Sequence, residues 1–213
     1  MKYNIEIKQD DCDYSPREWD NLGTMVCWHS RYNLGDEQPN HTHQQWLVNL
    51  AENYLEPYQD KISGWYTNEL WDYAFYNNIP KDIIPKLWDV ANKYYIILPL
   101  FVYEHGSITM NTSGYRCPWD SGQVGFIYVS IADVKKEYGW KRLTSKRRAQ
   151  IESYLQGEVT TYDHYLTGDV WGYVIEDEEE NHIDSCWGFY EYDECEQEAK
   201  SIVESMTLKT IPC

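Results

Sequence analysis

The sequence predicts an α+β fold, in which a mixed or antiparallel sheet, mainly from the second half of the chain, packs with several helices. Apolar residues recur every three or four positions in several segments, as on one face of a helix. Runs rich in β-branched and aromatic residues cluster between residues 94 and 190. No internal repeat or low-complexity linker divides the chain. We therefore expect a single domain over residues 1–213, with a helical N-terminal subregion (1–93) and a strand-rich acidic region (94–213).

Helices dominate the expected structure of the first half. One half-buried strand is predicted over residues 3–8, where polar and apolar residues alternate. Ser15 before Pro16 predicts the start of a short helix that Gly23 ends. Pro85 implies that the third of the later helices is kinked or starts near this residue. These later helices are expected from His41 to Pro57, over 68–76 and over 81–93.

Strands are expected to alternate with three helices in the second half. Ser130 predicts a helix cap, Gly139 the end of that short helix, and Gly168 the end of a long one. The predicted strands cover 94–104, 107–112, 123–130, 169–175 and 183–190, and the first two look buried. The predicted helices run from Ser130 to Gly139, from 144 or 145 to about 166, and from 193 to about 206.

Charge is unevenly distributed along the chain. It has 35 Asp and Glu against 18 Lys and Arg, which gives a formal net charge of −17. Sixteen of these carboxylates lie in residues 152–204. Residues 152–213 contain just two Lys or Arg residues, Lys200 and Lys209. Residues 101–150 carry eight Lys and Arg against four Asp and Glu. Such polarisation indicates a charged partner.

The acidic stretch is the candidate partner-binding surface. Duplex DNA carries one negative charge for about every 1.7 Å of its axis, and a hairpin and helix studded with carboxylates could present a comparable array to a basic protein groove. Tyr and Trp, which total 30 residues against four Phe, also favour recognition surfaces. The alternative is that the carboxylates only keep the protein soluble. The candidate residues are Glu176, Asp177, Glu178, Glu179, Glu180, Asp184, Tyr190, Glu191, Tyr192, Asp193, Glu194, Glu196 and Glu198.

Candidate catalytic and metal-binding residues are few. His41 and His43 could point to one metal ion, but a closed site needs further ligands that no spacing predicts. Glu104 and His105 are consecutive residues at the end of a predicted strand, where neighbouring side chains point to opposite faces. No nucleophile elbow, phosphate loop or dinucleotide fingerprint occurs. We therefore expect no catalytic residues, metal or cofactor. The alternative is a small metal-dependent hydrolase or nucleic-acid enzyme that uses His41, His43 and His105.

A basic cluster lies near the start of the predicted long helix. Lysine and arginine side chains can neutralise phosphates, so contact with nucleic acid is conceivable there. A solvated face, or internal ion pairing with the acidic third of the chain, is the favoured interpretation. The cluster consists of Lys141, Arg142, Lys146, Arg147 and Arg148.

Targeting signals are not evident in the sequence. The first residues lack the apolar core of a secretory signal, and the longest apolar run, residues 94–103, is too short to cross a bilayer. Six cysteines occur without a C-x-x-C pair, which indicates reduced thiols. We expect a cytoplasmic protein without a membrane partner.

Three blocks carry a resemblance to known proteins: residues 114–130 (GYRCPWDSGQVGFIYVS), 168–177 (GDVWGYVIED) and 184–190 (DSCWGFY). From about Ile97 to Tyr190 the chain resembles a largely uncharacterised family of acidic accessory proteins from bacteriophages and mobile elements. The resemblance implies a phage accessory gene expressed in a bacterial cytoplasm, and no catalytic residues. The expected function is that of a non-enzymatic inhibitor that occupies a basic nucleic-acid-binding site of a host defence or nucleic-acid enzyme. It would not bind nucleic acid directly. A homo-oligomer is possible, and a self-associating structural protein is a further alternative.

Overall fold

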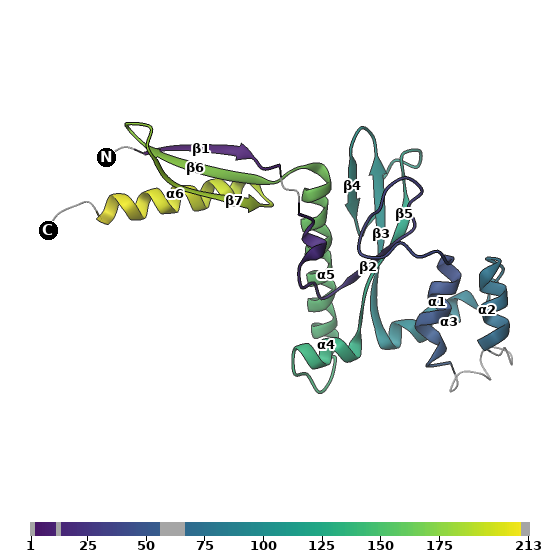
Figure 1. The fold of residues 1–213 in the computed structure, drawn as a ribbon. Coiled ribbons are helices and arrows are strands. Elements are labelled where there is room, and N and C mark those ends of the chain that lie inside the picture. Colours follow the sequence, from purple (N-terminus) through teal and green to yellow (C-terminus); the bar gives the residue numbers. More distant parts are fainter. Residues whose placement is uncertain (1–2, 12–13, 56–66, 210–213) are drawn as a thin grey trace. The chain divides into compact units, whose positions relative to one another are not determined.

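The computed structural model describes residues 3–11, 14–55 and 67–209, and this part of the chain is an α+β fold with six α-helices and seven strands (Figure 1). Strands β1, β6 and β7 form one antiparallel sheet, and β2, β5, β3 and β4 form a second in that order. The predicted fold class is therefore confirmed, with two sheets. The strands are β1 (Tyr3–Gln9), β2 (Thr24–Cys27), β3 (Tyr95–Glu104), β4 (Ile108–Asn111), β5 (Ser121–Ser130), β6 (Trp171–Asp177) and β7 (His182–Phe189). The helices are α1 (His43–Glu52), α2 (Thr67–Phe75), α3 (Ile84–Tyr94), α4 (Ile131–Glu137), α5 (Ser145–Thr167) and α6 (Tyr192–Lys209).

The chain forms two compact units that interleave in the sequence. The first comprises Met1–Asn21, Val102–Gly122 and Gly157–Cys213, and the second comprises Leu22–Phe101 and Gln123–Gln156. The first unit contains 23 Asp and Glu against six Lys and Arg, whereas the second contains 12 of each kind. The first, here called the acidic unit, thus carries the whole formal net charge, and the second is called the neutral unit.

The neutral unit has a core between strands β2, β3 and β5 and helices α1, α2 and α3. Trp46 of α1 stacks on Phe126 of β5, with ring centroids 4.7 Å apart, and Leu87 of α3 is fully buried in the same cluster. Ile127, the neighbour of Phe126 in β5, points to the opposite face because side chains alternate along a strand. There it lies close to Gly23 and to Leu155 of α5, and a Cβ atom at Gly23 would stand 2.5 Å from the Leu155 side chain.

Local signals position several of the predicted helices. Thr42 caps α1 in a capping box with Gln45, one residue after the predicted start at His41. The predicted end of this helix at Pro57 lies outside the described residues. Helix α3 begins at Ile84 with Pro85 in its first turn, which confirms the later start.

The acidic unit contains the three-stranded sheet, which α6 covers on one face (Figure 1). Tyr173 and Ile175 of β6 point towards α6 and pack with its Cys195 and Ala199. On the other face, Trp187 of β7 lies over its pairing partner Gly172. A Cβ atom at Gly172 would stand 2.1 Å from the indole ring, so this position accommodates the ring only as glycine.

Three local expectations were wrong. Strand β2 was not predicted, because four residues are too few to show an alternating pattern. The helix expected after Ser15 is a single 3-10 turn, Pro16–Glu18, in which Ser15 accepts a hydrogen bond from the Arg17 amide. Strands β3 and β4 are largely half-buried rather than buried.

Candidate functional site

The acidic turn between β6 and β7 is organised by Asp177. The Oδ1 atom of Asp177 accepts hydrogen bonds from the amides of Glu179 (2.8 Å) and Asn181 (2.9 Å). The Asn181 side-chain amide donates to both carboxylate oxygens, and the Asp177 amide donates to the Asn181 carbonyl. Hydrogen bonds from Asn181, and to a smaller extent from the Glu179 amide, hold the pKa of Asp177 below its usual value. This carboxylate therefore stays ionised and fixes the turn.

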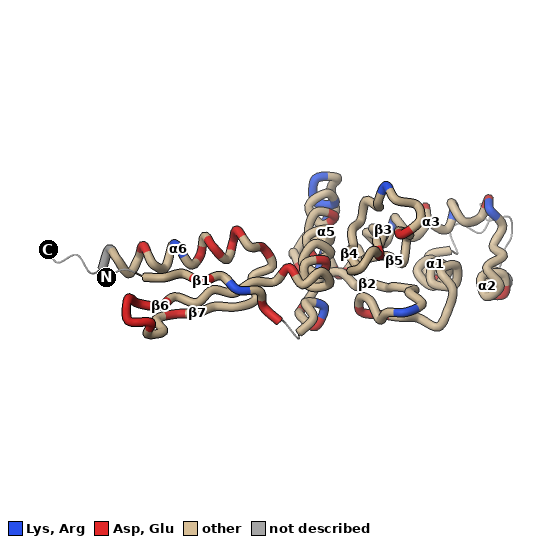
Figure 2. The backbone as a smooth tube through the Cα atoms, turned by 90° about the horizontal axis from the view of Figure 1, so that it is seen from above, with Lys and Arg blue, Asp and Glu red and all other residues tan. Residues whose placement is uncertain are grey.

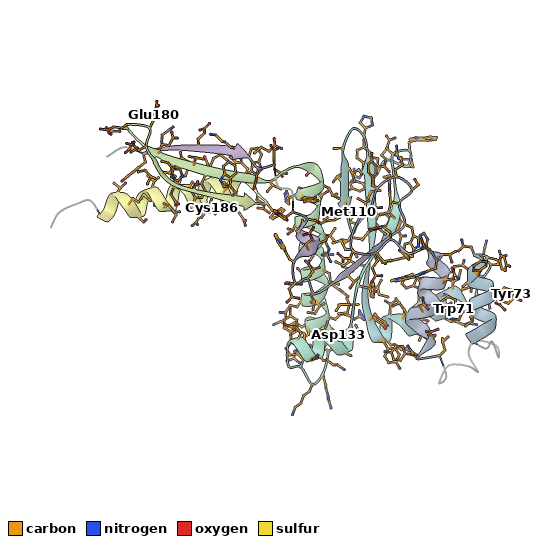
Figure 3. All side chains as sticks on the ribbon, in the orientation of Figure 1. Trp71, Tyr73, Met110, Asp133, Glu180 and Cys186 are labelled. Atoms are coloured by element: carbon orange, nitrogen blue, oxygen red, sulfur yellow. The ribbon has the colours of Figure 1, made fainter. Side chains whose placement is uncertain are left out.

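Three glutamates project from this turn. Glu178, Glu179 and Glu180 are exposed, and Figure 3 labels Glu180 at the tip of the hairpin. Glu180 has a φ angle of 63°, a left-handed conformation that costs a non-glycine residue about 1 kcal/mol. The Asp177 carbonyl accepts the Glu180 amide at 3.1 Å and helps to hold this conformation. The turn thus presents its carboxylates from a fixed backbone.

The second group of acidic residues lies at the start of α6. Cys195 and Ala199 face the sheet, whereas Asp193, Glu194 and Glu198 are exposed. Carboxylates in the first turn of a helix also interact favourably with its dipole. Glu196 is half-buried and forms an ion pair with Lys200 at 2.8 Å.

The structure does not bring the two acidic groups together. Strand β7, eight residues long, connects the turn to the region before α6, and a strand rises about 3.3 Å per residue. The two groups therefore lie roughly 25 Å apart, at opposite ends of the β1–β6–β7 sheet. Helix α6 then runs back along the sheet (Figure 1), and red segments mark both the turn and α6 in Figure 2.

Three further candidate residues, Tyr190, Tyr192 and Asp184, differ in their exposure to solvent. Tyr190 is half-buried and contacts Trp19 edge to face, with centroids 5.5 Å apart. Tyr192 retains 42% of its exposure beside Trp171. Asp184 is half-buried and accepts a long hydrogen bond of 3.4 Å from the Tyr173 hydroxyl. Burial, with Asp184 as the next cause, raises the pKa of Tyr173 to about 12.

Trp187, which is not among the candidate residues, is a further exposed aromatic ring of the acidic unit. It retains 46% of its exposure on the sheet face opposite α6. The available signal was a glycine inside a strand pattern, Gly172, because such a glycine often marks close approach of another group. The acidic unit therefore combines two sets of carboxylates with exposed Trp187 and Tyr192.

The histidines of the metal hypothesis occupy different settings. His41 and His43 lie beside Trp28 in the neutral unit, and the Trp28 indole donates to the His41 carbonyl at 2.7 Å. Partial burial lowers the pKa of His43. Across the described residues, no three His, Cys, Asp or Glu side chains are placed to hold a metal ion together.

His105 lies in the acidic unit beside Asp120. Its Nδ1 atom is 3.5 Å from the Asp120 carboxylate, and the Cys117 thiol lies 3.8 Å from the same carboxylate. The imidazole does not bridge a nucleophile and an acid in this arrangement, which a catalytic triad requires. The Asp120 carbonyl oxygen accepts a hydrogen bond from the Glu104 amide at 2.8 Å, which ties the loop before β5 to the end of β3. Asp120 thus has a structural role.

No family model matches the chain, and no curated protein or solved structure matches it. The resemblance to phage and mobile-element proteins therefore stays a prediction. None of the helices in residues 3–11, 14–55 and 67–209 is both long enough and apolar enough to cross a membrane.

Proposed function

We propose that the protein is a non-enzymatic binding protein whose acidic unit occupies a basic, nucleic-acid-binding surface of another protein. The observation that carries this proposal is the concentration of charge: 23 carboxylates against six cations in the acidic unit, and a balanced neutral unit. If the carboxylates served only solubility, they would be equally effective when spread over both units.

The local geometry supports binding by the turn and by α6. Asp177 holds the turn in one conformation, so its three exposed glutamates lose little backbone entropy on binding. The second acidic group, at the start of α6, would contact the partner about 25 Å away. This spacing is comparable with about three quarters of a helical turn of DNA, since half-sites one turn apart are separated by about 34 Å.

Exposed aromatic rings would supply the apolar contacts. Trp187 and Tyr192 are of the residue types that dominate binding energy in protein interfaces. Tyr190, already packed on Trp19, would support the start of α6 rather than anchor the partner alone. In the cellular setting that the sequence resemblance implies, the partner is a host defence or nucleic-acid enzyme in a bacterial cytoplasm.

Affinity capture tests this function. The whole protein would be immobilised and exposed to bacterial lysate at low salt, and the bound proteins would be eluted with duplex DNA. We expect elution of a nucleic-acid-binding protein. A variant with Glu178, Glu179, Glu194 and Glu196 replaced by glutamine should not retain it. Equal capture by both baits, or elution by salt but not by DNA, would contradict the proposal.

A further inference from the structure

A basic patch lies on the neutral unit, where α4 ends and α5 begins. Residues 135–148 contain seven Lys and Arg and one Glu. Because the neutral unit as a whole has equal numbers of acidic and basic residues, this stretch is a local concentration of positive charge. The basic patch is defined here as Lys135, Lys136, Lys141, Arg142, Lys146 and Arg147.

Neighbouring contacts fix the backbone that carries this patch. Arg148 donates to the carbonyls of Asn92 (2.7 Å) and Tyr95 (3.0 Å), which ties the start of α5 to the end of α3. Arg147 donates to the Arg142 carbonyl at 2.8 Å and so closes the loop before α5. Lys136, Lys141, Arg142 and Lys146 remain exposed on this fixed loop and helix.

Two aromatic rings are stacked within the patch. Tyr138 and Trp140 have centroids 4.6 Å apart and planes inclined by 27°. The Arg147 guanidinium lies 4.6 Å from the centre of the Trp140 ring, a cation–π contact. Gly139 between them has a φ angle of 63°, which L-residues rarely adopt, and the Trp140 amide donates back to the Lys135 carbonyl. Tyr138 retains 36% of its exposure.

We propose that the basic patch binds single-stranded nucleic acid, with its cations on the phosphates and an unpaired base stacked on Tyr138. Cations that follow a backbone beside an aromatic platform are the combination by which proteins bind single strands. Duplex DNA would use the cations alone, since its bases are already stacked on each other. The acidic unit of a second copy of the chain would complement the positive charge of the patch, but its binding would not require the stacked rings of Tyr138 and Trp140.

This inference departs from the expectation that the protein has no direct contact with nucleic acid. The sequence shows the cations but not the stacking of Tyr138 on Trp140 or the anchoring of Arg148. It is independent of the proposed function, because the basic patch lies in the neutral unit.

Fluorescence anisotropy with labelled oligo(dT) and a duplex of equal length tests the inference, with the whole protein at several salt concentrations. Lys141→Gln with Arg142→Gln should weaken oligo(dT) binding and lower the salt slope by about 1.4, since each contact with a single strand contributes about 0.7. Tyr138→Ala should weaken oligo(dT) binding about fivefold or more and leave duplex binding nearly unchanged. The matched control, Lys81→Gln with Lys86→Gln, removes two cations from the same unit and should behave as wild type.

Several results would overturn this inference. One is a lack of saturable oligo(dT) binding at low salt, and another is equal weakening by the control pair. If Tyr138→Ala binds oligo(dT) as tightly as wild type, the proposed stacking of a base on Tyr138 is refuted. Sedimentation is an independent measurement. If the protein does not bind oligo(dT) but forms a dimer at low salt, and if Lys141→Gln with Arg142→Gln dissociates this dimer, then the patch binds a second copy of the chain. Retained binding by the acidic-unit glutamine variant is expected whether or not the proposed function holds.

Discussion

The Arg17 guanidinium lies 2.9 Å from the Glu158 carboxylate, and the two side chains retain just 5% and 7% of their exposure. This ion pair joins the 3-10 turn near the N-terminus to the C-terminal half of α5 within the acidic unit. Removal of one partner from a buried pair leaves an uncompensated charge, which is costly.

Glu158→Gln should therefore lower the free energy of unfolding by about 3 kcal/mol. The measurement is urea unfolding at neutral pH. Glu152→Gln is the matched control, because it breaks the half-exposed pair with Arg148 in the same helix. That change should cost less than about 1 kcal/mol. Equal losses in the two variants would contradict the assigned burial.

Asp163 should be a second stabilising residue of the acidic unit. Its Oδ1 atom accepts hydrogen bonds from the Thr109 hydroxyl (2.7 Å) and the Met110 amide (2.6 Å) and thereby ties β4 to α5. Asp163→Ala leaves the Met110 amide without this acceptor and should cost about 1–3 kcal/mol. Hydrogen exchange of the Met110 amide would check the cause, and exchange at the wild-type rate would refute it.

Stability should depend on Asp169 at low pH. Hydrogen bonds from the Trp171 indole (2.6 Å) and from His164 (2.8 Å) lower the pKa of Asp169. A carboxyl group with a lowered folded-state pKa stabilises the fold above its unfolded pKa, near 3.8, and this contribution is lost as the pH falls through the folded value. Wild type should thus exceed Asp169→Asn in stability at pH 7, and the difference should shrink below pH 3.8. A constant difference across that range would contradict the linkage.

Chelation should not destabilise the protein. The described residues include no trio of His, Cys, Asp and Glu side chains suited to a metal, and a structural site would couple metal binding to folding by several kcal/mol. The melting temperature is expected to be the same with and without EDTA. A drop that zinc reverses would instead favour the metal-dependent enzyme built on His41, His43 and His105.

The sequence predicted what local periodicity and capping determine. The α5 pattern and Gly168, for example, predicted a helix to about residue 166, and α5 ends at Thr167, before Gly168 with its φ angle of 71°. The pairing of Arg17 with Glu158 spans 141 positions and left no local signal. Strand β2 was missed because its pairing with β5, rather than its own sequence pattern, determines its conformation.

The candidate surface was predictable in composition but not in arrangement. The run from Glu176 to Glu180 indicated an acidic turn, and the structure places it there. Asp177 holds the turn while Glu178, Glu179 and Glu180 are exposed, and this difference depends on the hydrogen bonds between Asp177 and Asn181. The separation of the turn from the start of α6 depends on the course of β7.

The most direct test of the acidic-surface account is the affinity for the captured partner across a salt series, with competing duplex DNA. The test variant carries glutamine at Glu178, Glu179, Glu194 and Glu196. Its matched control, in the neutral unit, is Asp72→Asn, Asp82→Asn, Asp89→Asn and Glu137→Gln. Each set removes four charges and one i,i+4 ion pair, Glu196 with Lys200 or Asp82 with Lys86.

We expect wild-type and control proteins to bind with equal affinity that falls steeply as salt rises, and DNA to displace both. The test variant should associate more slowly and show a shallower salt dependence. Wild-type affinity in the test variant at low salt, or simultaneous binding of DNA and this protein by the partner, would contradict the proposal that the acidic unit occupies a nucleic-acid site.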